Sequence, residues 1–261
     1  MTPAAWAREV AGYRHLLANC IRRELALKYR HSVLGIAWSF LKPLALTGLY
    51  VFATRHVLGI GDERAVAQIA IGVCAWGFFS GTLLDALRLL RQHRALLRQV
   101  AFPRELLVLG RVAVQAVELA LSLALFQALL ALTGHGDAWI DPLLLMPALA
   151  AAVLLALAIA LVVAPIGARF DDSVHLADVL LGALFWLTPV VYATARVPEP
   201  WRAWVDANPL SPVIGLLRSA LIAGEPAPAV APWLLAGLFA AVAAVALPLF
   251  RRATHDVAEI V

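Results

Sequence analysis

Charge and cysteine are both scarce in this chain of 261 residues. Charged residues make up 15% of it, against about a quarter in soluble globular domains, whose surface must stay hydrated. Of the two cysteines, Cys20 lies in a basic segment and Cys74 in an apolar run, so we expect neither a disulfide nor a cysteine metal site. These shortages exclude an ordinary water-soluble domain and a small disulfide-stabilised one.

Sequence motifs for nucleotide binding and catalysis are missing as well. A Walker A loop needs glycine directly before lysine, because backbone N–H groups and the ammonium together hold the phosphates. The two lysines of this chain, Lys28 and Lys42, both follow leucine. The sequence also has no G-x-S-x-G elbow, no H-E-x-x-H and no Cys/His cluster. We therefore expect this chain to contain no catalytic residue, no metal site and no bound cofactor.

Hydrophobic sequence, by contrast, is abundant. Hydrophobic residues make up 62% of the chain, and the mean hydropathy is +0.84. A helix that crosses a bilayer takes about 20 apolar residues. The apolar runs therefore predict a single-domain, all-α membrane protein with six transmembrane helices. The expected spans are residues 33–57, 68–90, 106–133, 142–168, 174–193 and 232–250.

The amino-terminal segment, residues 1–32, is basic and amphipathic. Apolar side chains recur every three or four positions, at Trp6, Val10, Tyr13, Leu17, Ile21 and Leu25. This spacing predicts a helix that lies in the membrane interface, and a soluble helix packed on its own chain is the alternative. Because no uninterrupted apolar stretch fits between its charges, we do not expect a cleavable signal peptide.

The distribution of basic residues predicts the orientation in the membrane. With the amino terminus in the cytoplasm, fifteen of the 21 lysines and arginines fall on the cytoplasmic side and five on the external side. Cytoplasmic loops carry the excess of lysine and arginine in multi-pass proteins. We therefore expect both termini in the cytoplasm.

Residues 194–231, between the last two expected spans, have the length of a loop but an apolar composition. Pro198 and Pro200 precede one apolar stretch, and Asn208–Pro212 is a helix-start signal before another. Both stretches are too short to span a bilayer. They predict two short re-entrant helices at the outer face, which we interpret as external gate helices.

A few charged residues lie within the expected spans, where charge is costly and therefore informative. For Asp85 we favour a local ion pair with Arg88 or Arg91 over a role in transport. Lys42 lies about 13 Å along a helix that begins at Val33, at 1.5 Å per residue. Its ammonium either lines a water-filled pore or reaches back to the inner interface, and both remain open.

Three further patterns within the spans concern helix faces. Glu118 and Gln115 are interpreted as helix-packing residues, and Gly77 and Gly81 form a weak G-x-x-x-G signal for close helix approach. One stripe lies on the face of Lys42: Trp38, Ala45, Leu49, Phe52 and His56. Another shares one face of the fifth expected span: Asp178, Gly182, Phe185, Pro189 and Tyr192.

Four ordered stretches of the sequence resemble ABC-2 type permeases of polysaccharide exporters, the group for O-antigen, teichoic-acid and capsule export. They are residues 27–44, 100–107, 187–192 and 208–212, and together their order and spacing match over nearly the whole chain. The first contains the family's motif that leads from the interfacial helix into the first span, namely Tyr29, Arg30, Ser32 and Gly35. One departure is Phe170-Asp171-Asp172, where the family often has aromatic-Arg-Asp, with the arginine displaced to Arg169.

The resemblance implies a homodimeric permease joined to two copies of a separate ATPase, which binds ATP and Mg²⁺. It also implies a cytoplasmic coupling helix at about residues 91–104 that docks into the ATPase, whereas plain cytoplasmic charge is the alternative. The implied coupling residues are Arg91, Arg94, Leu96, Leu97, Arg98, Phe102, Pro103 and Arg104. The first and fifth spans would line the conduit with Trp38, Lys42, Phe52, Asp178, Phe185, Pro189 and Tyr192. Aromatic faces among these would let sugar rings slide, since they bind without fixing one hydrogen-bond pattern.

The sequence and the resemblance together predict a permease subunit of an ATP-driven exporter in the bacterial inner membrane. Its cargo would be a polyprenyl-linked polysaccharide, and its partners the bilayer, a second copy and the ATPase, with no nucleic acid. An exporter of a small lipid or drug is one alternative. A polytopic membrane enzyme acting on lipid-linked sugar is another, although no catalytic set supports it.

Overall fold

The computed structural model describes residues 12–29, 37–59, 64–99, 102–133 and 139–254. Within these ranges the chain is helical and contains no β-strand, which confirms the predicted all-α class. The helices are α2 (Arg14–Tyr29), α3 (Trp38–Val51), the π-helical η2 (Phe52–Val57), α4 (Ala65–Gln92), α5 (Arg94–Gln99), α6 (Glu105–Thr133), α7 (Pro142–Arg169), α8 (Ser173–Leu187), the 3-10 turn η3 (Thr194–Arg196), α9 (Glu199–Ala207), α10 (Leu210–Leu221) and α11 (Pro232–Thr254).

Four of these helices, α4, α6, α7 and α11, are long and apolar enough to cross a membrane. The other two predicted spans form shorter helices. The first consists of α3 continued by η2, and the fifth is the 15-residue α8. Helix α8 ends at Leu187, six residues before the predicted end of the span, because Pro189 cannot continue a helix and disfavours helical geometry at Thr188.

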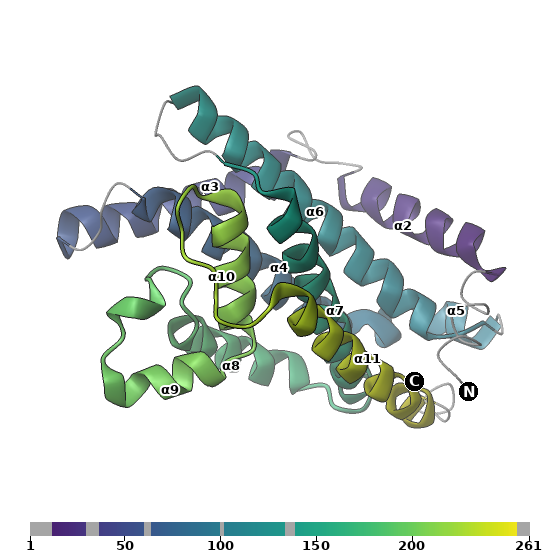
Figure 1. Ribbon diagram of the computed structural model, residues 1–261. Coiled ribbons are helices and arrows are strands. Elements are labelled where there is room, and N and C mark those ends of the chain that lie inside the picture. Colours follow the sequence, from purple (N-terminus) through teal and green to yellow (C-terminus); the bar gives the residue numbers. More distant parts are fainter. Residues whose placement is uncertain (1–11, 30–36, 60–63, 100–101, 134–138, 255–261) are drawn as a thin grey trace.

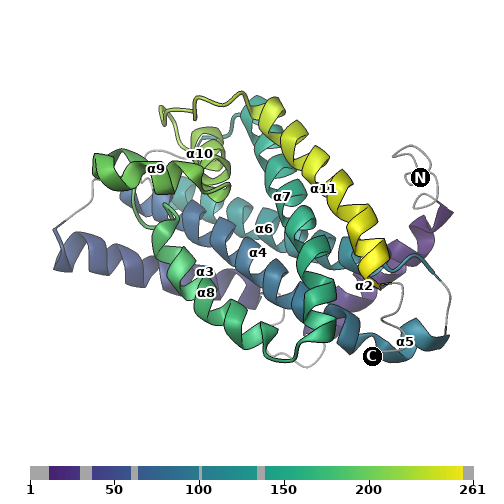
Figure 2. The same ribbon diagram turned by 90° about the horizontal axis from the view of Figure 1, so that it is seen from below.

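Helix α7 is the centre of the bundle. It packs along α4 and α11 and also contacts α6 and α10. Figures 1 and 2 show that α5 and the carboxyl end of α11 lie at one end of the molecule, whereas α9 lies at the other. We call these the α5 end and the α9 end.

Two glycines allow helix α4 to approach other parts of the chain closely. A Cβ atom on Gly167 of α7 would lie 1.9 Å from the Leu87 carbonyl oxygen of α4. A Cβ on Gly72 of α4 would lie 2.3 Å from the Val190 carbonyl oxygen, in the segment after α8. The predicted pair behaves differently, because a Cβ on Gly77 would meet no atom within 4 Å and one on Gly81 would meet the Gln115 side chain.

The amino-terminal helix α2 packs along α6. A Cβ on Gly110 of α6 would lie 3.7 Å from Leu17, and Arg111 of α6 pairs with Glu24 at 2.9 Å. Tyr29 is the last residue of α2. The other residues of the motif that leads into the first span, Arg30, Ser32 and Gly35, lie outside the described residues.

Candidate functional site

The predicted coupling segment lies at the α5 end, where it turns its apolar residues inward. Leu96, Leu97 and Phe102 are half-buried and pack against a core cluster built from α4, α6, α7 and α11. Arg94 and Arg98 on α5 are exposed, while Pro103 and Arg104 are half-buried. The surface that α5 offers to a partner is therefore basic, and the apolar ridge expected from the sequence seats α5 on its own chain.

Ion pairs and a hydrogen bond join the helix ends at this side of the molecule. Arg91 at the end of α4 pairs with Asp171 in the α7–α8 turn. The Arg169 guanidinium donates to the Ala253 carbonyl of α11 at 2.9 Å. Arg251 of α11 donates through Nε to Glu105 of α6 at 2.8 Å, and Glu105 is buried. These contacts join the ends of α4, α6, α7 and α11 and the α7–α8 turn at the α5 end of the molecule.

At the α9 end, two of the stretches that resemble ABC-2 permeases, residues 187–192 and 208–212, contact each other. The Asn208 amide donates to the Thr188 hydroxyl at 2.8 Å, and its carbonyl oxygen accepts from the Leu210 backbone N–H at 3.0 Å. Asn208 therefore starts α10 and ties it to the end of α8. Helix α9 exposes Trp201 and Trp204, whereas most of α10 is buried against α7 and α4.

Arg218 is a buried cation in the apolar helix α10, and it holds three segments together. Its guanidinium donates to the carbonyls of Gln68 at 3.0 Å, Val190 at 2.8 Å and Tyr192 at 3.2 Å. Burial lowers the pKa of Arg218 to about 10, partly offset by Glu225 and Tyr192, so the group stays charged at neutral pH. In the predicted orientation, Arg218 is one of the five basic residues on the external side. Its position in an apolar helix was the sequence signal for a buried role.

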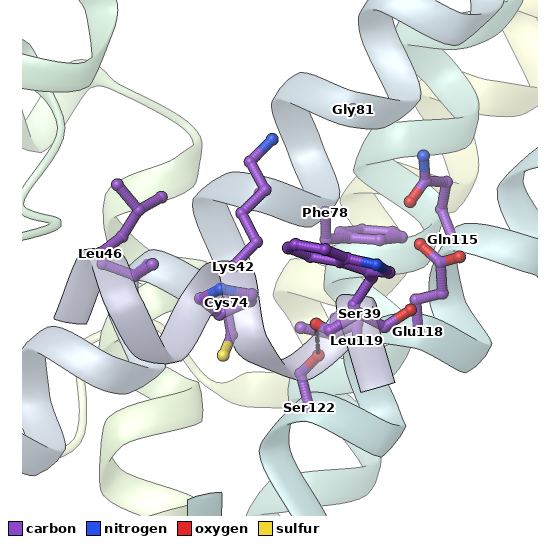
Figure 3. A pocket seen from close by; sticks show the side chains of 14 residues that line it. Ser39, Lys42, Leu46, Cys74, Phe78, Gly81, Gln115, Glu118, Leu119 and Ser122 are labelled. Carbon is purple, nitrogen blue, oxygen red and sulfur yellow. Dashed lines mark hydrogen bonds between the residues drawn. The ribbon is translucent and has the colours of Figure 1, made fainter. Parts of the chain in front are cut away.

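A cavity of about 340 Å³ opens between α3, α4 and α6 (Figure 3). Trp38 and Lys42 line it from α3, and Gln115, Glu118 and Ser122 line it from α6. The Ser122 hydroxyl donates to the Ser39 carbonyl at 3.0 Å, which fixes α3 against α6.

A chain of polar side chains connects this cavity with helix α2. The Gln115 amide donates to Asp85 at 2.8 Å, and Arg111 lies 3.7 Å from Asp85 and 2.9 Å from Glu24. The prediction of a local pair between Asp85 and Arg88 or Arg91 was wrong. Arg91 turns to Asp171 instead, and Arg111 on the neighbouring α6 is the nearer cation.

A second cavity of about 220 Å³ lies near the α9 end, between α3, η2, α4 and the segment after α8. Tyr50, Trp186 and Tyr192 contribute aromatic rings to its lining, and Arg196 contributes a cation. Behind this lining Phe185 stacks on Tyr50, with ring centres 5.3 Å apart.

The structure distributes the predicted conduit residues over different environments. Trp38 and Lys42 line the first cavity, and Tyr192 lines the second. Phe52 and Asp178 are exposed on the surface of the chain. Phe185 and Pro189 are buried. The predicted fifth-span stripe is thus divided, because the chain leaves the helix after Leu187 and Pro189 turns into the bundle.

Comparison with known proteins identifies relatives over most of the chain. The profile of the family described as ABC-2 type transporter matches residues 15–222. The chain is 30% identical over 214 residues to the O-antigen export system permease protein RfbA of Myxococcus xanthus, covering 81% of each chain. It is 21% identical over 203 residues to a protein of the same name from Klebsiella pneumoniae, covering 76% of this chain and 77% of that one.

Proposed function

The chain belongs to the ABC-2 type transporter family, and from this we propose that it moves a polyprenyl-linked polysaccharide across the bacterial inner membrane as the permease subunit of an ATP-driven exporter. The likeness to O-antigen export permeases over four-fifths of both chains is the observation that carries this proposal. The four apolar helices of spanning length agree with a membrane protein.

Our proposal includes six membrane crossings, with α3–η2 and α8 as the additional two. The α9 end would face outward, and both termini would lie in the cytoplasm. The distribution of basic residues supports this orientation. Exposed tryptophans mark the α9 end as one membrane–water interface, because such rings gather at both interfaces. Four of them stand beside the segments assigned to the outer face: Trp139, Trp201, Trp204 and Trp233. Helices α9 and α10 would then form the outer gate.

We further propose that two copies of this chain assemble with two copies of a separate ATPase, which binds ATP and Mg²⁺. The α5 end is the surface that fits such a partner. Arg94 and Arg98 are exposed there, and the bonds from Arg91 and Arg251 connect it with the ends of neighbouring helices. A displacement of α5 by the ATPase would therefore also displace the helices of the bundle.

Reversing the charge of Arg94 and Arg98 together is expected to reduce co-purification of the ATPase about tenfold or more. Two exposed cations at a docking surface become two carboxylates, and like charges facing each other across an interface weaken association. The measurement is the amount of ATPase retained on the tagged permease. Arg55→Glu with Arg196→Glu is the matched control, because both arginines are exposed outside the α5 end. Undiminished retention by the first variant would exclude this docking surface.

A further inference from the structure

A lysine, Lys42, lines the cavity between α3, α4 and α6. Among the described residues, Lys42 makes no hydrogen bond and no ion pair, and its side chain extends along the cavity toward Gly81 (Figure 3). An ammonium within a membrane domain is costly unless an anion or water compensates it. The Lys42 side chain is exposed on the single chain, so a ligand that enters the cavity can reach its ammonium.

The neighbouring charges already have partners of their own. Asp85 lies between Arg111 and the Gln115 amide, and Arg111 also holds Glu24. Glu118 stands on α6, the wall opposite Lys42, and forms no ion pair with it. The protein thus presents an ammonium on one side of the cavity and the side-chain carbonyl oxygen of Gln115 on the other.

The shape of the cavity suits the head group of a lipid. Its volume of about 340 Å³ is at the low end for small-molecule sites. Its α4 wall is shallow because Gly77 and Gly81 have no side chains. Phe78 and Leu119, which belong to the buried core, make part of the lining apolar.

We propose that this cavity binds a lipid-borne phosphate, with Lys42 as its cation. A lysine ammonium is a compact point charge that suits phosphate oxygens. Gln115 lies on the opposite wall, and its side-chain carbonyl oxygen can accept a hydrogen bond from a sugar hydroxyl. The proposal rests on the proposed function for its choice of source, which is a lipid-linked glycan rather than bulk phospholipid.

The test is a binding measurement on the full chain in a phosphate-free detergent. The probes are a labelled polyprenyl monophosphate and, as competitor, phosphatidylglycerol. Lys42→Gln is expected to weaken binding of the polyprenyl phosphate about tenfold or more, whereas Lys42→Arg retains most of it. Lys42 is exposed and makes no hydrogen bond or ion pair with another described residue, so Lys42→Gln is expected to leave the fold intact.

A second variant tests the cavity independently of the charge. Gly77→Leu places a side chain in open space within the cavity, since a Cβ there meets nothing within 4 Å, and it is expected to block binding as well. Gly237→Leu is the matched control, because Gly237 on α11 also faces open space but does not line the cavity. Binding that is unchanged in both Lys42→Gln and Gly77→Leu would overturn the proposal.

Competition then distinguishes the two sources of phosphate. If phosphatidylglycerol displaces the polyprenyl phosphate poorly, the cavity selects the carrier lipid. Equal displacement supports a phosphate site that bulk lipid fills, and it overturns the assignment to the exported substrate. Because the readout is binding, it stays informative even if the chain proves not to export a glycan.

Discussion

Replacing Gly167 with alanine is expected to reduce the amount of correctly folded protein in the membrane to a small fraction. The new methyl carbon would lie 1.9 Å from the Leu87 carbonyl oxygen, well inside van der Waals contact. The obstacle is the backbone of α4 where it packs against the carboxyl end of α7, so no side-chain rotation relieves it. Separating α4 from α7 would open one of the most extensive helix contacts of the bundle, at a cost of about 3 kcal/mol or more.

The measurement is the monodisperse fraction in size-exclusion chromatography and the thermal midpoint in detergent. Gly237→Ala is the control, because a Cβ at Gly237 meets nothing within 4 Å. Alanine there should leave both quantities unchanged or slightly higher, since alanine favours a helix more than glycine does. If Gly167→Ala matched Gly237→Ala in yield and midpoint, the close crossing of α4 and α7 would be incorrect.

The second large effect is expected at Arg218. Its replacement by methionine removes the donors that serve the carbonyls of Gln68, Val190 and Tyr192 and leaves them in an apolar setting. Removing one partner of a buried charged network costs about 3–5 kcal/mol. We expect α10 and the segment after α8 to come loose together, which would lower the thermal midpoint and speed proteolysis between residues 188 and 231.

Two further variants separate this role from general loss of charge. Arg218→Lys should recover only part of the stability, because an ammonium lacks the planar fork that reaches several carbonyls at once. Arg202→Met should cost little, since Arg202 makes an exposed pair with Glu199, and such pairs contribute about 0–1 kcal/mol. An Arg218→Met protein as resistant to protease as Arg202→Met would show that Arg218 does not hold the outer segment in place.

The sequence was sufficient for features that depend on local pattern. Apolar length placed α4, α6, α7 and α11 to within a few residues, and Asn208 marked the beginning of α10. The fifth span was predicted too long, although Pro189 was visible in the sequence, because apolar composition continued past the proline. Hydropathy records what surrounds a segment, whereas helix ends depend on backbone geometry.

Features that depend on contacts between distant segments could not be predicted. Backbone approaches Gly72 and Gly167 most closely, whereas of the Gly77–Gly81 pair only Gly81 meets a neighbour, the Gln115 side chain of α6. Spacing along one helix cannot show which face another helix will meet. The same reason applies to Asp85, whose nearest described cation is Arg111 on another helix rather than Arg88 on its own.

The proposed division of labour, in which this chain forms the path and a partner supplies ATP hydrolysis, is tested most directly by reconstitution. The purified permease would be placed in proteoliposomes with and without its ATPase, together with a polyprenyl-linked glycan and Mg²⁺-ATP. The account predicts glycan movement only when both proteins and ATP are present, and no nucleotide hydrolysis by the permease alone. Glycan movement without the ATPase, or ATP hydrolysis by this chain by itself, would contradict it.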